Sequence, residues 1–223
     1  MNRLIAIAAA ALVLAGGIYA WQSSQGGTSY PTLGAAQAQS ADAEVDTSMV
    51  VEMALGDENA PVEVVEYASF TCPHCKDFHR DTFKDVKANY IDTGKVRFIY
   101  REVYFDRYGL WASMVARCGG EAKFFGIVDM IYDQQSEWTA SGDPATIAGE
   151  LARIGRTAGI DGDEVDACLR DAEMAQGLVA SYEENAGRDG IRSTPSFMIN
   201  GELVTGNKSF ADFSALLDAE LDS

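Results

Sequence analysis

Two cysteines separated by two residues, in the sequence Cys72-Pro73-His74-Cys75, carry the clearest chemistry in this chain. Residues three apart at the start of a helix share one face, so the two sulfur atoms can bond to each other. Pro73 suits the first helical turn, where its missing N–H costs nothing. Cys72 then lies where free backbone N–H groups and the helix dipole stabilise a thiolate and lower its pKa. A protonated His74 would add a second positive charge, and Cys75, one turn further, is expected to be the buried resolving thiol.

A stabilised thiolate favours the reduced form, which makes the disulfide a stronger oxidant. Two other interpretations of the pair remain, an inert structural disulfide and half of a zinc site. Cys72, Cys75 and His79 have the spacing C-x2-C-x3-H, but a structural zinc site needs a fourth ligand, and His74 is the only other histidine. We therefore favour redox chemistry, predict no metal, and expect His79 on the solvent side of its helix.

A strand, a helix and a second strand surround the cysteine pair. Residues 61–68 are apolar and β-branched and begin with a proline, as at the start of a strand. Apolar residues then recur at helical spacing from the cysteines to about residue 90, and a second strand pattern covers residues 96–103. This βαβ unit predicts an α/β fold.

From about residue 107 to residue 185 the apolar period is 3.6, so a long helical segment interrupts the strands. One helix is expected to begin at Asp143-Pro144 and to end at Gly159. A further helix is predicted from about residue 163 to residue 185. Aromatic residues of this segment are expected in its core: Trp111, Phe124, Phe125 and Trp138.

The strand pattern returns after residue 195. Residues 196–199 and 202–204 flank Asn200-Gly201, a strong signal for a two-residue hairpin, and an amphipathic helix closes the chain. Pro195 precedes this hairpin and has no plain local role. A cis bond after Thr194 would form a tight turn facing the cysteines, while an ordinary trans proline at a strand edge is the alternative.

Residues 1–21 are predicted to be a signal peptide or an N-terminal membrane anchor, because Arg3 precedes an uncharged apolar run. Residues 22–46 are rich in Ser, Gln, Gly and Ala and predict a flexible linker. Export would place the cysteines where disulfides persist. The net charge of −17 over 223 residues argues against nucleic acid as a partner.

Cys72-Pro73-His74-Cys75 after a strand, a helical insertion, and then Thr194-Pro195-Ser196-Phe197 together resemble the DsbA-like thioredoxin family of exported thiol:disulfide oxidoreductases. The resemblance covers about residues 50–221. It implies a thioredoxin fold with an inserted all-helical domain, a cis-Pro195, and Cys72 as the nucleophile that forms mixed disulfides. The implied domains are a first thioredoxin part at 47–106, a helical insertion at 107–187 and a second thioredoxin part at 188–223.

The resemblance also assigns Glu66, six residues before Cys72, to the buried acid of the family, which transfers protons to and from Cys75. A partly exposed acid on the strand is the alternative. Two positions depart from the family pattern. Thr194 stands where the best-known oxidases carry Val, and Tyr100, with Arg101 adjacent, stands where their basic partner of the buried acid lies.

The remaining cysteines, Cys118 and Cys168, lie on apolar helix faces 50 positions apart. In an exported protein a structural disulfide between them is favoured, and two buried free thiols are the alternative. The pair also resembles an extra disulfide found in some family members.

The expected function is donation of the Cys72–Cys75 disulfide to unfolded or reduced secreted proteins in the periplasm, with no bound cofactor. The implied partner for re-oxidation is a DsbB-like quinone-linked membrane protein, and a monomer is expected. The alternatives are a disulfide isomerase or reductase for dedicated clients, a metal-binding module that uses the cysteines, and a holdase chaperone whose cysteines are not used.

Overall fold

The computed structural model describes residues 45–223. The predicted signal or anchor at 1–21 lies outside the described residues, as does nearly all of the predicted linker at 22–46. Within residues 45–223, no helix is both long enough and apolar enough to cross a bilayer.

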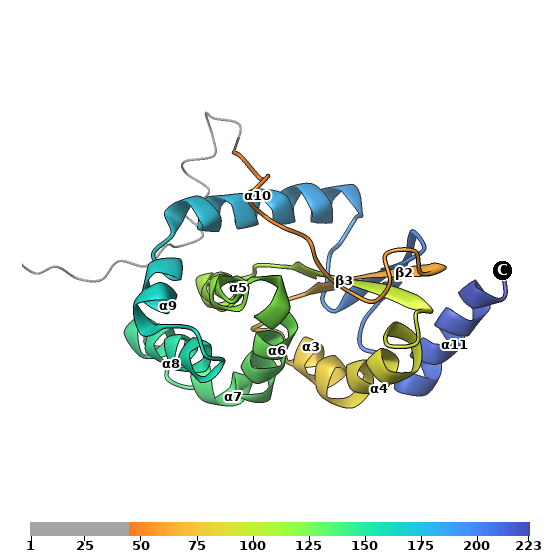
Figure 1. Cartoon of the computed structure of the whole chain (residues 1–223), viewed down its shortest axis with the longest axis horizontal. Helices are drawn as coiled ribbons and strands as arrows, with labels where there is room; N and C mark the ends of the chain where they lie inside the picture. The colour runs from red at the N-terminus through yellow and green to blue at the C-terminus, as the bar shows by residue number, and fades with distance from the viewer. Residues whose placement is uncertain (1–44) are drawn as a thin grey trace, which may run out of the picture. The chain divides into compact units, whose positions relative to one another are not determined.

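The described chain alternates strands and helices, with one long helical interruption (Figure 1). The strands are β1 (Met53–Leu55), β2 (Val62–Ala68), β3 (Val96–Glu102), β4 (Ser196–Ile199) and β5 (Glu202–Thr205). The helices around the sheet are α3 (Pro73–Phe78), η1 (His79–Phe83), α4 (Lys84–Val86), η2 (Lys87–Ile91) and α11 (Phe210–Leu221). The interruption comprises α5 (Arg107–Cys118), α6 (Gly120–Asp133), α7 (Gln135–Trp138), α8 (Pro144–Thr157), α9 (Gly162–Cys168) and α10 (Ala172–Arg188).

The five strands form one sheet in the order β1-β3-β2-β4-β5, which places β2 at the centre. β2 and β3 are parallel, with Glu66 opposite Tyr100, and the other neighbouring pairs are antiparallel. The parallel pair is the predicted βαβ unit. The sequence patterns did not predict β1, because its three residues are too few to show an alternation.

Alternation along β2 sends its side chains to two different helical layers. Val62 and Val64 join the cluster formed with the helices that run from α3 to η2 and with α11, while Val65 and Tyr67 join a second cluster with α10. Figure 1 shows these helices on opposite sides of the sheet. Glu66 shares the parity of Val64, so the strand directs its carboxylate toward the helices that follow the cysteines.

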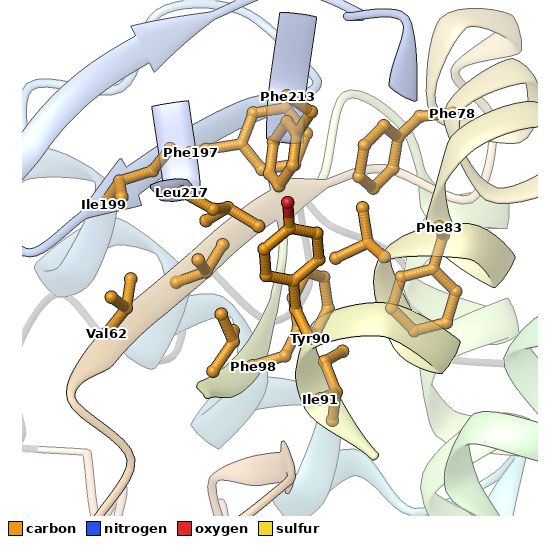
Figure 2. Packing of buried hydrophobic residues seen from close by; sticks show 13 residues of the cluster. Val62, Phe78, Phe83, Tyr90, Ile91, Phe98, Phe197, Ile199, Phe213 and Leu217 are labelled. Carbon is orange, nitrogen blue, oxygen red and sulfur yellow. The ribbon is translucent and has the colours of Figure 1, made fainter. Parts of the chain in front are cut away.

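Aromatic rings fill the first of these clusters (Figure 2). The ring of Phe78 lies 4.7 Å from that of Phe197 and 5.4 Å from that of Phe213, measured between centroids. Each such pair contributes about 0.5–1.5 kcal/mol beyond the area that it buries. The end of the cysteine-bearing helix α3 is thereby held against β4 and α11.

The helix after the cysteines runs on from Pro73 to Ile91, as predicted, but two stretches of it, η1 and η2, have π-helical hydrogen bonding. π-Helical turns widen the helix locally and often occur at functional sites. The hairpin is also observed: Asn200 and Gly201 both have positive φ, of 45° and 88°, as a turn that matches the strand twist requires.

The helical insertion differs from the prediction at one point. The single helix predicted from about residue 163 to residue 185 is two helices, α9 and α10, which break at Leu169–Asp171. The break occurs because the Asp171 side chain accepts the N–H of Met174 and so caps a new helix. Within the insertion Trp111, Phe124 and Trp138 are buried as expected, whereas Phe125 is only partly buried.

Candidate active site

Cys72 and Cys75 lie at the start of α3, next to the end of the central strand. Cys72 is the N-cap residue in extended conformation, and Pro73 occupies the first helical turn. Cys72 is partly exposed, whereas Cys75 is fully buried, and both are free thiols in this structure. An incoming thiolate can therefore reach Cys72 and not Cys75.

The surroundings of Cys72 favour its thiolate. The Cys75 side chain is the main group that lowers its pKa, followed by the Thr194 side chain and the backbone N–H groups of Cys75 and His74. These donors outweigh the cost of burial and hold the pKa of Cys72 at about 5. His74 contributes to this balance through its backbone N–H, and its side chain is exposed.

The surroundings of Cys75 favour its neutral thiol over the thiolate. Burial is the main cause that raises the pKa of its thiol, and the hydrogen bond to Cys72 and the nearby carboxyl of Glu66 act in the same direction. At neutral pH the reduced pair therefore holds one thiolate, on Cys72, and one neutral thiol, on Cys75. The two sulfurs are chemically distinct.

The loop before β4 reaches the cysteines. The Thr194–Pro195 peptide bond is cis, and the carbonyl oxygen of Thr194 lies 3.4 Å from the sulfur of Cys72, where it can accept from the protonated thiol. Two hydrogen bonds secure this loop: Gly206 N–H donates to the Pro195 carbonyl at 2.8 Å, and the Ser196 hydroxyl donates to the Ser193 carbonyl at 2.8 Å.

Glu66 is fully buried, which removes the alternative of a partly exposed strand acid. Its Oε2 lies 2.9 Å from Nε2 of His79. The expectation that His79 lies on the solvent side is therefore wrong, since this side chain is only 2% exposed. His79 follows Cys75 by four residues and thus shares the buried face of the helix.

The partner of the buried acid is consequently His79, and Tyr100 and Arg101 do not take that place. The Tyr100 hydroxyl is hydrogen-bonded to the Tyr132 hydroxyl at 2.7 Å. Arg101 has the opposite parity on β3 and donates instead to Tyr67 and to the carboxylate of Glu52.

Two residues that hold the cysteine loop were not found from the sequence. Nε2 of the buried Gln135 donates to the carbonyls of Phe70 at 2.8 Å and of Cys72 at 3.0 Å, which joins α7 to the loop. The hydroxyl of Thr71 donates to Asp106, the N-cap residue of α5. An acid just before the predicted helix was a visible signal for Asp106, but nothing local distinguishes Gln135.

Cys118 and Cys168 form a disulfide with a Cα–Cα distance of 5.9 Å. It joins the end of α5 to the end of α9. Within residues 45–223, no three His, Cys, Asp or Glu side chains are placed to hold a metal ion. His79, the histidine of the zinc alternative, is hydrogen-bonded through Nε2 to Glu66.

Comparison with known proteins agrees with this architecture. A thioredoxin family model matches residues 48–219. A Rickettsia bellii protein, provisionally named a protein-disulfide oxidoreductase, is 34% identical over 172 residues, which are 77% of this chain and 65% of that protein. Disulfide bond formation protein D of Bacillus subtilis is 27% identical over 172 residues, which are 73% of this chain and 72% of that protein. This chain thus spans less than two thirds of the Rickettsia relative and a larger share of the Bacillus one.

A solved structure gives the same result. The crystal structure of alpha-DsbA1 from Wolbachia pipientis matches with a TM-score of 0.69 and 27% identity, covering 78% of this chain and 94% of that one. The predicted fold class, a thioredoxin fold with an inserted all-helical domain, is confirmed. The chain belongs to the thioredoxin family, and within it to the DsbA-like proteins.

Proposed function

We propose that this protein is an exported thiol:disulfide oxidoreductase that donates the Cys72–Cys75 disulfide to folding proteins. The observation that carries the proposal is the opposite environment of the two sulfurs. Cys72 is partly exposed with a pKa lowered to about 5, while Cys75 is buried with a raised pKa. A low pKa makes Cys72 a good leaving group and favours the reduced state, so the disulfide is readily given away.

The proposed reaction has two thiolate attacks. A substrate thiolate attacks the sulfur of Cys72, the Cys72–Cys75 bond breaks, and Cys75 leaves with the electron pair and takes up a proton. A second substrate thiolate then attacks the substrate sulfur of the mixed disulfide and releases Cys72 as a thiolate. Two electrons have moved from the substrate to the protein, and the substrate has gained a disulfide.

Three further residues have roles in this proposal. Glu66 is buried on the face of the sheet against which the helix of Cys75 packs, and in this proposal it gives the leaving Cys75 its proton. Thr194 and Pro195 form the turn beside the sulfur of Cys72, where an extended substrate segment can pair with their backbone. Cys118 and Cys168 are structural, because their disulfide closes a loop within the helical insertion.

A second candidate function differs from the first in the direction of disulfide exchange. Thr194 in place of Val before Pro195 is also found in isomerases and reductases, which favours a disulfide isomerase or reductase for dedicated clients. The name of the Bacillus relative, a disulfide bond formation protein, favours the oxidase direction. We therefore place the oxidase first.

The cellular setting follows from the same proposal. We infer export to the periplasm, with residues 4–21 as cleaved signal or retained tether, because an oxidising compartment lets the pair work as a disulfide. The proposed substrates are unfolded or reduced secreted proteins. The proposed re-oxidant is a DsbB-like membrane quinone reductase that accepts the two electrons from Cys72 and Cys75, and the protein acts as a monomer.

The decisive measurement is the equilibrium reduction potential of the Cys72–Cys75 pair against glutathione buffers. A potential well above that of the glutathione pool supports the oxidase, because the pair then gives up its disulfide. A potential well below it overturns the oxidase and leaves the reductase.

Variants test the assignment of the two sulfurs. Cys72→Ser is expected to abolish oxidation of a reduced dithiol peptide, and Cys75→Ser to accumulate a mixed disulfide at Cys72. The matched control is Cys118→Ala/Cys168→Ala, which removes two cysteines and leaves turnover in place. A fully active Cys72→Ser protein would contradict the mechanism and favour the chaperone alternative.

A further inference from the structure

A pair of ionisable side chains lies beneath the cysteines with two polar atoms unused. Oε2 of Glu66 is hydrogen-bonded to Nε2 of His79, but Oε1 of Glu66 and Nδ1 of His79 have no hydrogen-bond partner among the described residues. Both side chains are at least 98% buried. A buried polar atom without a partner costs free energy, so two such atoms on one pair require an explanation.

The imidazole ring of His79 packs against the insertion helix α6. The imidazole stacks on the ring of Tyr132 at 4.6 Å between centroids. Asp129 precedes Tyr132 by three residues on α6 and therefore shares its face. Asp129 is half-buried, which raises the pKa of its carboxyl, and the charge of His79 acts on that carboxyl in the opposite direction.

The strands and the insertion helix that pack against His79 bring ionisable groups to it, whereas one neighbouring element does not. These groups are Glu66 from β2, Tyr100 from β3, and Asp129 and Tyr132 from α6. Two more ionisable groups act on members of this set: the carboxyl of Glu66 acts on Cys75 of α3, and Lys84 of α4 acts on Asp129. The exception, α11, packs through apolar Phe213 and Leu217. Among these groups Asp129 is the carboxyl that is partly open to solvent.

We propose that His79 is a proton-relay residue, which positions Glu66 and carries protons between it and Asp129 during turnover of the cysteine pair. An imidazole suits this task because it can accept a proton at one ring nitrogen while it releases one from the other. The two atoms without a partner are then the two ends of the relay: Oε1 exchanges a proton with Cys75, and Nδ1 exchanges one with Asp129. This inference rests on the oxidoreductase function proposed above.

The relay supplies the proton that Cys75 takes up in the first step of the reaction. When the substrate thiolate breaks the Cys72–Cys75 bond, Cys75 leaves with the electron pair and takes the proton of Glu66. Glu66 regains a proton from Nε2 of His79, which regains one at Nδ1 from Asp129, and Asp129 regains one from water. One proton moves from solvent to Cys75, and the relay runs in reverse when the pair is re-oxidised.

The test is single-turnover oxidation of a reduced dithiol peptide by the full chain between about pH 5 and pH 8. His79→Gln keeps a donor for Glu66 but cannot relay a proton, so its rate at the upper end is expected to fall by roughly a hundredfold. Hydronium is then the remaining proton source, so the ratio of wild-type to variant rates is expected to grow toward about tenfold per pH unit. The double variant Glu66→Gln/His79→Gln is expected to be no slower than Glu66→Gln alone.

Asp129→Asn tests the outer end of the relay at a position that is partly exposed, where folding is less at risk than at His79. It is expected to slow the reaction with the same rising dependence on pH. Its matched control, Glu121→Gln on the exposed surface of α6, is expected to match wild type. The rate at which iodoacetamide alkylates Cys72 is expected to stay at the wild-type value in both His79→Gln and Asp129→Asn.

A rate ratio that stays constant with pH, or losses that add in the double variant, would overturn the relay and leave His79 a structural neighbour. Wild-type protein that fails to oxidise the peptide at all would instead overturn the proposed function, so the two failures are distinguishable.

Discussion

Removal of the disulfide in the helical insertion is expected to cost a large part of the stability of this protein. The bond joins residues 50 positions apart, Cys118 at the end of α5 and Cys168 at the end of α9. The chain-entropy relation for a loop of that length gives about 4 kcal/mol, within the range found when native disulfides are removed. For a domain of this size, the loss corresponds to a fall in Tm of about 8–16 °C.

The assay is thermal and urea unfolding of Cys118→Ala/Cys168→Ala beside wild type, followed by circular dichroism with the Cys72–Cys75 pair in the same redox state. Cys118→Ala alone is the matched control, since it opens the same loop and must lose nearly as much. A double variant within about 1 kcal/mol of wild type would refute the reasoning, because the loop would then place little constraint on the unfolded chain.

Three further outcomes are expected. The pKa of Cys72 is lowered from 9.0 to about 5, so its thiolate stabilises the folded reduced protein fully above about pH 9, and that stabilisation is lost as pH falls through about 5. The urea midpoints of the reduced wild-type protein should therefore approach those of Cys72→Ser as pH falls from about 9 to about 5. Midpoints that differ by the same amount at every pH would contradict the shift. Gln135→Leu leaves the buried carbonyls of Phe70 and Cys72 without this donor and is expected to lower the free energy of unfolding by about 2–4 kcal/mol; an unchanged urea midpoint would show that the loop does not depend on it. Glu102→Gln removes the charge that pairs with the guanidinium of Arg117, whose side chain is 7% exposed, and is expected to lower the free energy of unfolding by about 3–5 kcal/mol. A loss of less than about 1 kcal/mol in chemical denaturation would mean that the ion pair is solvated.

Features that depend on near neighbours in the chain could be predicted from the sequence. Cys72 and Pro73 begin a helix because proline belongs in a first turn, and Asn200-Gly201 turns a hairpin because both residues tolerate positive φ. The period of the apolar residues is also a local feature, and it distinguished the helical insertion from the strands. The positions of Cys72, Cys75 and Pro195 at one site came from the resemblance to a family, not from the periodicity.

Features that depend on packing between distant segments could not be predicted in this way. Spacing alone places Cys75 and His79 on one face of a helix, but only the sheet beneath shows that this face is the buried one and that Glu66 lies opposite. Gln135 is 63 residues from Cys72, and its role depends on how α7 packs against the cysteine loop. The break before α10 had a local signal in Asp171, but a continuous apolar period concealed it.

The helical insertion leaves the sheet from β3 and returns to it at β4, the two strands on either side of β2. Its outgoing connection binds the cysteine loop through Asp106 and Thr71, and its returning connection touches the sulfur of Cys72 through Thr194. Two side chains from inside the insertion also contact the active site: Gln135 of α7 donates to the carbonyl of Cys72, and Tyr132 of α6 stacks on His79. The insertion is therefore part of the scaffold that positions the sulfurs, and a shortened insertion that lost α6 or α7 would leave the cysteine loop without these contacts.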